Sequence, residues 1–321
     1  MGNPGCVIIS AMSAQPRSLC LFAAILLGTI AGSAQPGGGN NPPDPASDLL
    51  RQARQKMTDG KADEALGLYK QAAEKFPDSV AANNQAGVAL DLAGQYSEAR
   101  KYFVKSIDVA KTPQAKGQGQ RNMAMSYAFE GDCKNAAKYE GPLYQQYLDA
   151  KDYFNAGETA DELARVCIDA GSLDDAYQWY QKGHDAGMNE TPPAQKDLWT
   201  YRWEHAQARI AARRGNHAEA EKHVAAAKAV LDKGTMPAQQ ASFFPYLTGY
   251  VAFYGGDYKT ALADFQKANQ NDPFIQVMIA QTYEKLGDKA QATEYYKKAM
   301  TFNGHNPPAA YARPLAKKKL G

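Results

Sequence analysis

The residues with catalytic or metal-binding potential are few and scattered along the chain. The five histidines are His184, His205, His217, His223 and His305, and none belongs to an HExxH zinc motif. His217 and His223 are six residues apart, so a helix would place them on different faces and not at one metal ion. A GxSxG nucleophile motif, a P-loop and a strand-linked dinucleotide glycine motif are all absent. The sequence therefore predicts a protein that is not an enzyme and uses neither a cofactor nor a metal.

The composition is that of a folded soluble chain, with 44% hydrophobic and 22% charged residues. The net charge is only +2, from 36 basic and 34 acidic residues. Nucleic-acid-binding proteins usually carry a stronger and more clustered basic excess, so a nucleic-acid partner is not expected. The length of 321 residues suits about two ordinary domains or one repeat array.

An internal repeat supplies the elements that position the polar and aromatic residues. The stretches GKADEALGLYKQAAEKFP and GQYSEARKYFVKSIDVAK align directly, with Ala65 and Ala99 placed 34 residues apart. Each copy predicts a first helix, a glycine turn, and a second helix with apolar residues at i, i+4 and i+7. Seven copies share this frame, and their aligned alanines are Ala65, Ala99, Ala136, Ala176, Ala220, Ala261 and Ala292.

Residue size within the frame predicts how the two helices of a copy pack. Small residues on the first helices are expected to face the frame alanines, so that two backbones cross closely. These small residues are Gly87, Ala124, Ala164, Ala208 and Gly249. Larger residues on the second helices are expected to fill the gap to the next copy, and these are Tyr69, Phe103, Tyr180, Phe265 and Tyr296. Copies three and five depart from the pattern, with Glu140 and Val224 where an aromatic residue is expected.

The frame resembles the tetratricopeptide repeat family, whose unit has 34 residues, and the likeness covers about residues 46 to 304. Copies two, six and seven fit best, with Gly249, Gly256, Ala261, Phe265 and Pro273 in copy six. The resemblance implies an all-α fold, a right-handed superhelix of about seven helix pairs in which each pair mainly contacts its neighbours. The final segment, residues 305–321, is expected to cap the end of the stack.

The resemblance also implies that the first helices line a concave groove. In copies four to six the inward positions hold charged and aromatic residues. The expected groove residues are Arg165, Arg202, His205, Arg209, Arg213, Tyr246, Tyr250, Phe253 and Tyr254, with Asp161 and Asp169 beside them. For the arginines the alternative is an ordinary solvated helix face. For the four rings the alternative is burial under the insertion KGTMPAQQAS.

The expected function is that of a scaffold or adaptor that binds a protein partner in this groove. Arginines hold carboxylates through paired hydrogen bonds, and tyrosines add contact area, so an extended acidic peptide would fit. A carbohydrate-binding module for envelope glycans is the alternative, with the copy-six rings stacking on sugars. A third hypothesis is an enzyme whose site is assembled from the inserted loops.

The N-terminus predicts export. Arg17 precedes the apolar run LCLFAAILLGTIAG and a small-residue cleavage site ending at Ala34, the order of a secretory signal peptide over residues 1–34. The run is shorter than the ~20 residues of a transmembrane helix, so no stable span is expected after cleavage. Residues 35–47, rich in Gly, Pro and Asn, form a predicted flexible linker, and the repeat array follows over 48–304. The expected location is periplasmic or extracellular, in a bacterial envelope.

Two cysteines, Cys133 and Cys167, remain after the signal is removed. In the repeat frame Cys133 begins the second helix of copy three, and Cys167 ends the first helix of copy four. Those helices are expected to pack antiparallel, which would bring the thiols close, and export permits a disulfide. Two buried free thiols are the favoured reading, because free cysteine is commonly buried. The disulfide remains the alternative.

Overall fold

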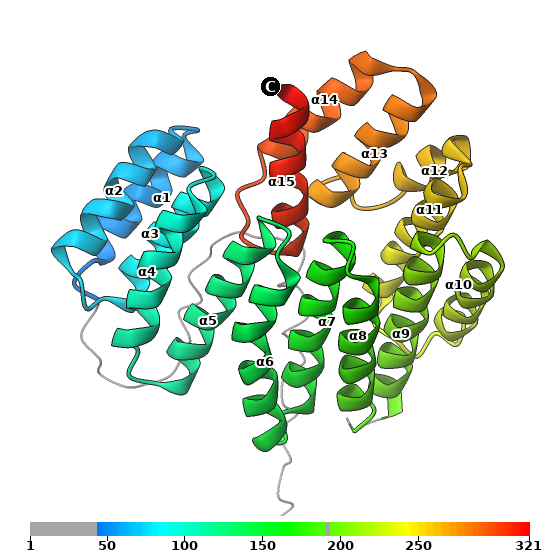
Figure 1. The fold of residues 1–321 in the computed structure, drawn as a ribbon, viewed down its shortest axis with the longest axis horizontal. Helices are drawn as coiled ribbons and strands as arrows, with labels where there is room; N and C mark the ends of the chain where they lie inside the picture. Colours follow the sequence, from blue (N-terminus) through cyan, green and yellow to red (C-terminus); the bar gives the residue numbers. More distant parts are fainter. Residues whose placement is uncertain (1–43, 190–192) are drawn as a thin grey trace, which may run out of the picture.

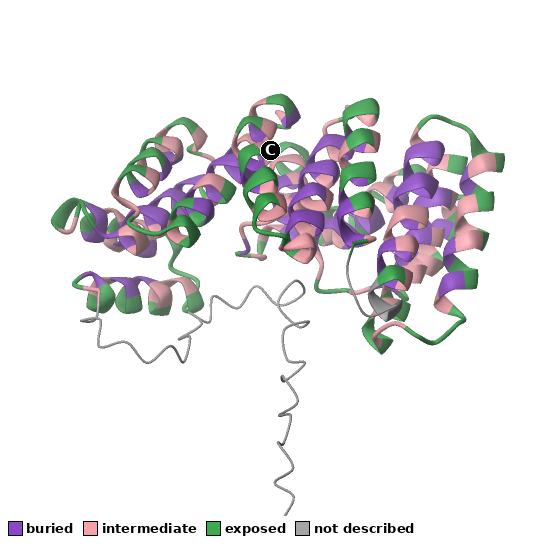
Figure 2. Ribbon diagram, turned by 90° about the horizontal axis from the view of Figure 1, so that it is seen from below, coloured by how far each residue is buried: buried purple, intermediate pink, exposed green. Residues whose placement is uncertain are grey.

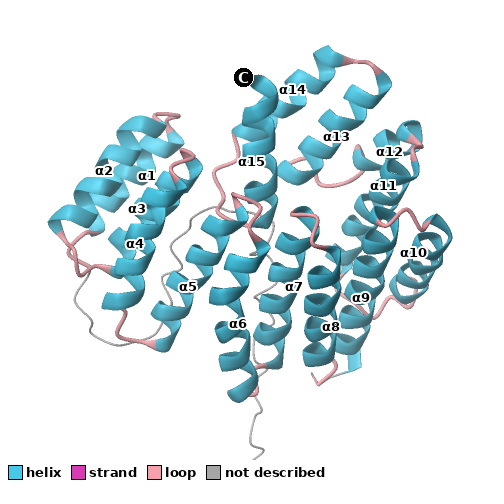
Figure 3. Ribbon diagram, viewed as in Figure 1, coloured by secondary structure: helices cyan, strands magenta, loops and turns pink. Residues whose placement is uncertain are grey.

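The computed structural model describes residues 44–189 and 193–321. Within these residues the chain forms fifteen α-helices and a short 3-10 helix, η1, and no strand (Figure 3). In chain order the elements are α1 Ser47–Thr58, α2 Ala62–Lys75, α3 Val80–Leu92, α4 Tyr96–Val109, α5 Pro113–Ala128, α6 Cys133–Asp149, α7 Tyr153–Asp169, α8 Leu173–Gly187, α9 Pro193–Arg213, α10 His217–Leu231, η1 Ala238–Phe243, α11 Phe244–Gly255, α12 Tyr258–Phe265, α13 Pro273–Leu286, α14 Lys289–Met300 and α15 Pro307–Leu320.

Helices α1 to α14 form seven antiparallel pairs, each stacked on the next (Figure 1). Buried residues lie on the helix faces turned toward neighbouring helices, and exposed residues lie on the outer faces and turns (Figure 2). The predicted all-α superhelix of seven helix pairs is therefore confirmed. Helix α15 packs on α14 and α13, as expected of a capping segment, and it also reaches α5 and α7 in the middle of the chain.

A glycine ends the first helix of every copy in a left-handed backbone conformation. The seven are Gly60, Gly94, Gly131, Gly171, Gly215, Gly256 and Gly287, with φ between 70° and 87°. Residues with a Cβ atom are disfavoured in this region, which explains the recurring glycine. In copies three and six the next residue, Asp132 or Asp257, accepts a backbone hydrogen bond and caps the second helix. Two adjacent residues thus end one helix and begin the next.

The frame alanines form the contact between the two helices of each copy, and all seven are at most 3% exposed. The small residues of the first helices make room for aromatic rings as well. A Cβ atom added to Gly87 would lie 2.4 Å from a ring carbon of Phe103, and one added to Gly249 would lie 2.8 Å from a ring carbon of Phe265. The expectation that these glycines face only the frame alanines was therefore incomplete.

Copy three carries a carboxylate in place of the usual aromatic ring. Glu140 is 1% exposed, and neither of its carboxylate oxygens has a hydrogen-bond partner among the described residues. Burial raises the pKa of Glu140 well above its usual value, the neighbouring Glu162 raises it further, and Arg121 opposes the shift. A buried acid without a hydrogen-bond partner is a local defect in the core of this copy.

The start of the described chain belongs to the fold. Helix α1 begins at Ser47, Ala46 is fully buried, and the Asp44 carboxylate accepts a 2.7 Å hydrogen bond from the Ser79 hydroxyl. Residues 44–47, the end of the predicted linker, are thus packed against copy two. The predicted signal peptide, residues 1–34, lies outside the described residues. Among the helices that the structure describes, none is both long enough and apolar enough to cross a membrane.

A disulfide joins Cys133, the first residue of α6, to Cys167 in the last turn of α7. Both residues are buried. The structure contains the bridge, so the favoured reading of two free thiols was wrong. The bond links copy three to copy four near the middle of the array.

Candidate partner-binding site

Three first helices, α7, α9 and α11, bring arginine and tyrosine side chains together. Each helix contributes the residues that the repeat frame turns inward, and the second helix α8 adds one tyrosine. We call this group the arginine–tyrosine layer, and it consists of Arg165, Arg209, Arg213, Tyr180, Tyr246, Tyr250 and Tyr254. It contains six of the nine residues predicted to line the groove.

Arg209 is at the centre of the layer and is only 6% exposed. Its guanidinium group donates to the Tyr180 hydroxyl at 2.6 Å and the Tyr246 hydroxyl at 3.0 Å, and its Nε donates to the His205 carbonyl oxygen at 3.4 Å. All three acceptors are neutral oxygens. Because a guanidinium group binds carboxylates more strongly than neutral oxygens, Arg209 is a cation without its preferred partner.

Arg165 and Arg213 flank this centre. The Arg165 guanidinium lies 5.0 Å from the Phe274 ring centroid, within cation–π range, and its Nε and Nη2 atoms are enclosed without a hydrogen-bond partner in the described part of the chain. Arg213 lies over the Tyr254 ring at 5.2 Å and donates a long hydrogen bond of 3.4 Å to the Tyr250 hydroxyl. The layer therefore contains arginine N–H groups that have no hydrogen-bond acceptor.

Nearby titratable groups are shifted toward their neutral forms. Burial raises the pKa of Asp169 to about 6, although Arg165, Arg209 and Arg213 lower it. Burial also raises the pKa of Asp161 to about 7, against the lowering effect of Arg202 and Arg209. Burial lowers the pKa of His205 well below its usual value, and Arg209 lowers it further. The arginines thus keep their charge while the acids beside them are partly neutralised near neutral pH.

Protein covers much of this layer. Tyr246 is 7% exposed and Tyr250 is 1% exposed. The Phe274 ring of α13 lies 5.6 Å from Tyr246 and 6.3 Å from Tyr250, between ring centroids. Tyr254 is partly exposed. Met236 of the insertion that was considered as a cover packs on a cluster of α9, α10 and α11 residues, which Tyr254 also contacts. Tyr246 and Tyr250 are covered by Phe274 of α13, which the repeat frame did not indicate.

Two predicted groove residues are not members of the layer. Arg202 pairs with Glu158 and lies 4.7 Å from the Trp199 ring centroid. Phe253 is partly exposed and borders the layer, because its ring packs edge-on against Tyr254 at 5.2 Å and against Tyr258 at 5.6 Å between ring centroids. The remaining residue, His205, is buried beside the layer, 5.2 Å from Tyr246 between ring centroids.

The sequence interpretation missed Tyr180, Phe274 and Tyr311, which complete the surroundings of the layer. Tyr180 was assigned to core packing alone, yet its hydroxyl is a partner of Arg209. Tyr311 of α15 packs on Phe274, with ring centroids 5.1 Å apart. The contact of Tyr180 could have been predicted from the sequence. A buried tyrosine hydroxyl needs a hydrogen-bond partner, and Arg209 of the following copy is a candidate donor.

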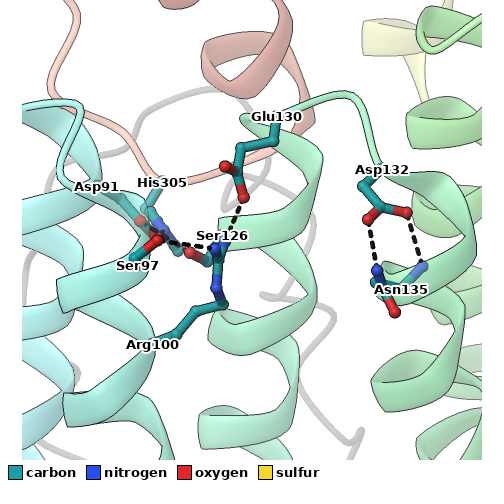
Figure 4. Close-up of polar contacts among 8 residues, drawn as sticks. All are labelled: Asp91, Ser97, Arg100, Ser126, Glu130, Asp132, Asn135 and His305. Carbon is teal, nitrogen blue, oxygen red and sulfur yellow. Dashed lines mark hydrogen bonds and ion pairs between the residues drawn. The ribbon is translucent and has the colours of Figure 1, made fainter.

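A second buried polar cluster joins distant parts of the chain (Figure 4). The Asp91 carboxylate accepts a 2.8 Å hydrogen bond from the Ser126 hydroxyl, and its other oxygen lies 2.8 Å from His305 Nε2. Serine, histidine and aspartate also form hydrolase triads, but there the histidine lies between the other two. Here the carboxylate lies between them, so His305 is not placed to take a proton from Ser126. The cluster connects α3, α5 and the segment before α15.

The described residues contain no group of three or more histidine, cysteine, aspartate or glutamate side chains arranged to hold a metal ion.

Comparison with known proteins identifies the repeat. Two models described as tetratricopeptide repeat match residues 50–115 and residues 275–306. No curated protein matches the chain. The structure of the apo form of RapI aligns with a TM-score of 0.53 at 9% identity, covering 86% of this chain and 98% of that one. A tetratricopeptide repeat protein from Parabacteroides merdae aligns with a TM-score of 0.49 at 16% identity, covering 86% and 97%.

The matched segments lie at the two ends of the array, and the seven turn glycines and frame alanines continue the same unit between them. The RapI likeness, at 9% identity, supports the fold alone. Residues 50–115 and 275–306 are thus tetratricopeptide repeats, and the helix pairs between them share the same frame.

Proposed function

We propose that this protein is an exported scaffold that binds a partner protein on the inner side of its superhelix, where an acidic group of the partner reaches the arginine–tyrosine layer. Tetratricopeptide repeats generally serve in protein interactions and not in catalysis, which supports the scaffold role. The finer proposal depends on one observation. The Arg165 guanidinium has two enclosed nitrogen atoms without an acceptor, and the neighbouring Arg209 donates only to neutral oxygens.

A carboxylate is the ligand that would satisfy these groups best. Unpaired buried donors cost about 1–3 kcal/mol each, and hydrogen bonds between charged groups are about twice as strong as neutral ones. Asp169 could compensate the arginines, but its raised pKa of about 6 leaves it partly protonated in mildly acidic conditions. A glutamate, an aspartate or a C-terminal carboxylate of a partner would supply the missing acceptor.

Export is part of the proposal and is supported by two observations. The order of charge, apolar run and small residues before Ala34 is typical of a secretory signal. The Cys133–Cys167 disulfide fits an oxidising compartment, because such bonds are rare in the cytosol. Intact-mass measurement of protein from the native host tests both points, since it reports the mature N-terminus and whether the two thiols are oxidised. A chain that still begins at Met1 or Met12 with free thiols would contradict export.

The binding role is tested by crosslinking and co-purification from the native host with Arg165→Gln and the matched control Arg202→Gln. Arg202 is already paired with Glu158, so the control removes one arginine of the inner face without removing an unpaired donor. We expect Arg165→Gln to lose partners that Arg202→Gln and wild type retain, and the retained complexes to weaken as salt rises. Identical partners for all three proteins would show that the layer is not the binding site.

A further inference from the structure

The segment after the seventh helix pair does more than cap the array. We define the C-terminal strap as residues 301–320, which comprise a short loop and α15. Figure 1 shows α15 at the centre of the molecule, with the first copies on one side of it and the last copies on the other. A cap needs contacts with α13 and α14 only, yet this strap also contacts α5 and α7.

Two polar anchors fasten the strap to copy two. His305 Nε2 lies 2.8 Å from the Asp91 carboxylate, across 214 residues of sequence. The Arg313 guanidinium donates to the Leu92 carbonyl oxygen at 2.9 Å, 221 residues away, and also to the carbonyl oxygens of Met300 and Phe302. The bonds to Asp91 and Leu92 connect the strap to α3. Stacking of neighbouring copies alone would not bring these two segments together.

The apolar contacts of the strap are small by comparison. Its fully or nearly fully buried side chains are Ala309, Ala310, Ala312 and Ala316. A buried methylene-sized group contributes about 0.8 kcal/mol, so alanines hold a helix much less firmly than leucines would. The strap's larger apolar side chains, Phe302, Tyr311 and Leu315, are only partly buried, and the Tyr311 ring lies 5.1 Å from Phe274 between ring centroids. The two polar anchors add directed bonds to these contacts.

The strap also covers the arginine–tyrosine layer. Tyr311 interacts electrostatically with Tyr254, Asp169 and Arg213, and it packs on the same Phe274 ring that covers Tyr246 and Tyr250. Ala309 and Ala310 belong to one buried cluster with residues of α5 and α7, among them Ile168. A partner approaching the layer from the inner side of the superhelix meets the strap first.

We propose that the C-terminal strap is a built-in gate that occludes the arginine–tyrosine layer when anchored to α3 and exposes it when His305 and Arg313 release. This inference rests on the proposed function, since it assigns a control to the same site. A partner that contacts Asp91 and the Leu92 carbonyl would release the strap and open the layer together, because a ligand shifts such an equilibrium by its differential affinity for the two states.

The test uses the full mature chain with each anchor removed singly, as His305→Ala and as Arg313→Ala. Lys318→Ala is the matched control, because Lys318 is an exposed residue of α15 that holds neither anchor. Hydrogen exchange of the α15 amides reports opening. A fluorescein-labelled hexaglutamate peptide reports access to the arginines, with hexaglutamine as the uncharged comparison.

We expect each anchor variant to exchange its α15 amides about tenfold faster than wild type and to bind hexaglutamate about fivefold more tightly, because the binding-competent fraction rises. Lys318→Ala should match wild type in both measurements. Adding Arg165→Gln to His305→Ala should abolish the gain in binding while leaving the faster exchange. Two single variants on different elements keep the test valid if one of them fails to fold.

A failure of the gate and a failure of the proposed function give different results. Unchanged α15 exchange in both anchor variants would overturn the gate. Faster exchange with measurable but equal hexaglutamate affinity in every protein would also overturn the gate and would leave the proposed function standing. If no protein binds hexaglutamate, with the strap open or closed, the proposed acidic ligand is wrong, and the gate falls with it because it would guard no such site.

Discussion

Copies one and two share their repeat frame with copies four to six, but the inner faces of the two regions differ. The frame alanines are fully buried in both, as with Ala65 and Ala261. At the inward positions of the frame, Arg54 and Met57 of copy one remain partly exposed and Asp91 of copy two is buried against Ser126 and His305, whereas Arg209 and Tyr250 in copies five and six are enclosed in the arginine–tyrosine layer. The contrast shows that the frame determines how pairs stack and leaves the inner positions free for another use, here a polar and aromatic layer under α13 and the strap.

The largest expected effect concerns the junction between these regions, where the disulfide joins α6 to α7. Replacing Cys133 and Cys167 together by alanine should lower the free energy of unfolding by about 3–4 kcal/mol, as expected for a bridge that closes a 34-residue separation. Urea unfolding measures the loss, and hydrogen exchange should localise it to copies three and four. Two free thiols in denatured, unreduced wild-type protein would rule out this prediction.

Glycine replacements test whether both regions pack their pairs alike. Gly87→Ala in copy two and Gly249→Ala in copy six should each cost about 1–3 kcal/mol, because the new methyl group would lie 2.4 Å and 2.8 Å from buried phenylalanine rings. Thermal unfolding of the two variants compares the regions directly. A neutral effect in one region only would mean that its rings shift freely, and the shared packing would then be wrong.

A pH series tests the defect in copy three, which lies between the two regions. The folded-state pKa of Glu140 is raised above the unfolded value, so folding is penalised once pH exceeds the unfolded pKa. The contribution of Glu140 to the free energy of unfolding is greatest below its unfolded-state pKa, and it falls as pH rises through its folded-state pKa. Glu140→Gln should therefore stabilise the protein by about 1–2 kcal/mol at neutral pH and by little near pH 4, as measured by urea unfolding. A gain that is the same at both pH values would contradict the assignment.

The smallest expected effect has the opposite sign and serves as the control for the glycine series. Gly67 lies in the middle of α2, and a Cβ atom there would meet no other atom within 4 Å. Gly67→Ala should stabilise the protein by about 0.5–1 kcal/mol through helix propensity alone. Calorimetry should show a slightly higher melting temperature, and a destabilisation would indicate that copy one packs differently from the structure.

Local features of this fold were predictable from the sequence because each repeats with its own physical signal. Gly256 is required by a left-handed turn, Ala261 by the close crossing of two helices, and Phe265 by the space beside Gly249. The frame also placed Arg209 and Tyr246 at corresponding positions of neighbouring first helices, and the two side chains are hydrogen-bonded. The same frame brought Cys133 near Cys167 but held no information on whether the thiols were joined.

The cover over the layer was not predictable in this way. Whether Tyr250 faces solvent depends on how α13 of the next copy packs on α11, which the repeat frame does not specify. The attachment of Arg313 to Leu92 depends on the summed rotations of the copies between them, since the two residues are 221 positions apart. Local patterns carry no signal for such contacts, and the alanine-rich tail looked like a simple cap.

The bonds of His305 and Arg313 also order events in time. A repeat array made only of neighbouring contacts can begin to fold anywhere and propagate, but a contact spanning 214 residues forms only after the intervening copies have taken their places. Copies one to seven are synthesised before residues 301–320. Attachment of the strap to α3 therefore follows the stacking of these copies, and it links the unfolding of copy two to that of copy seven.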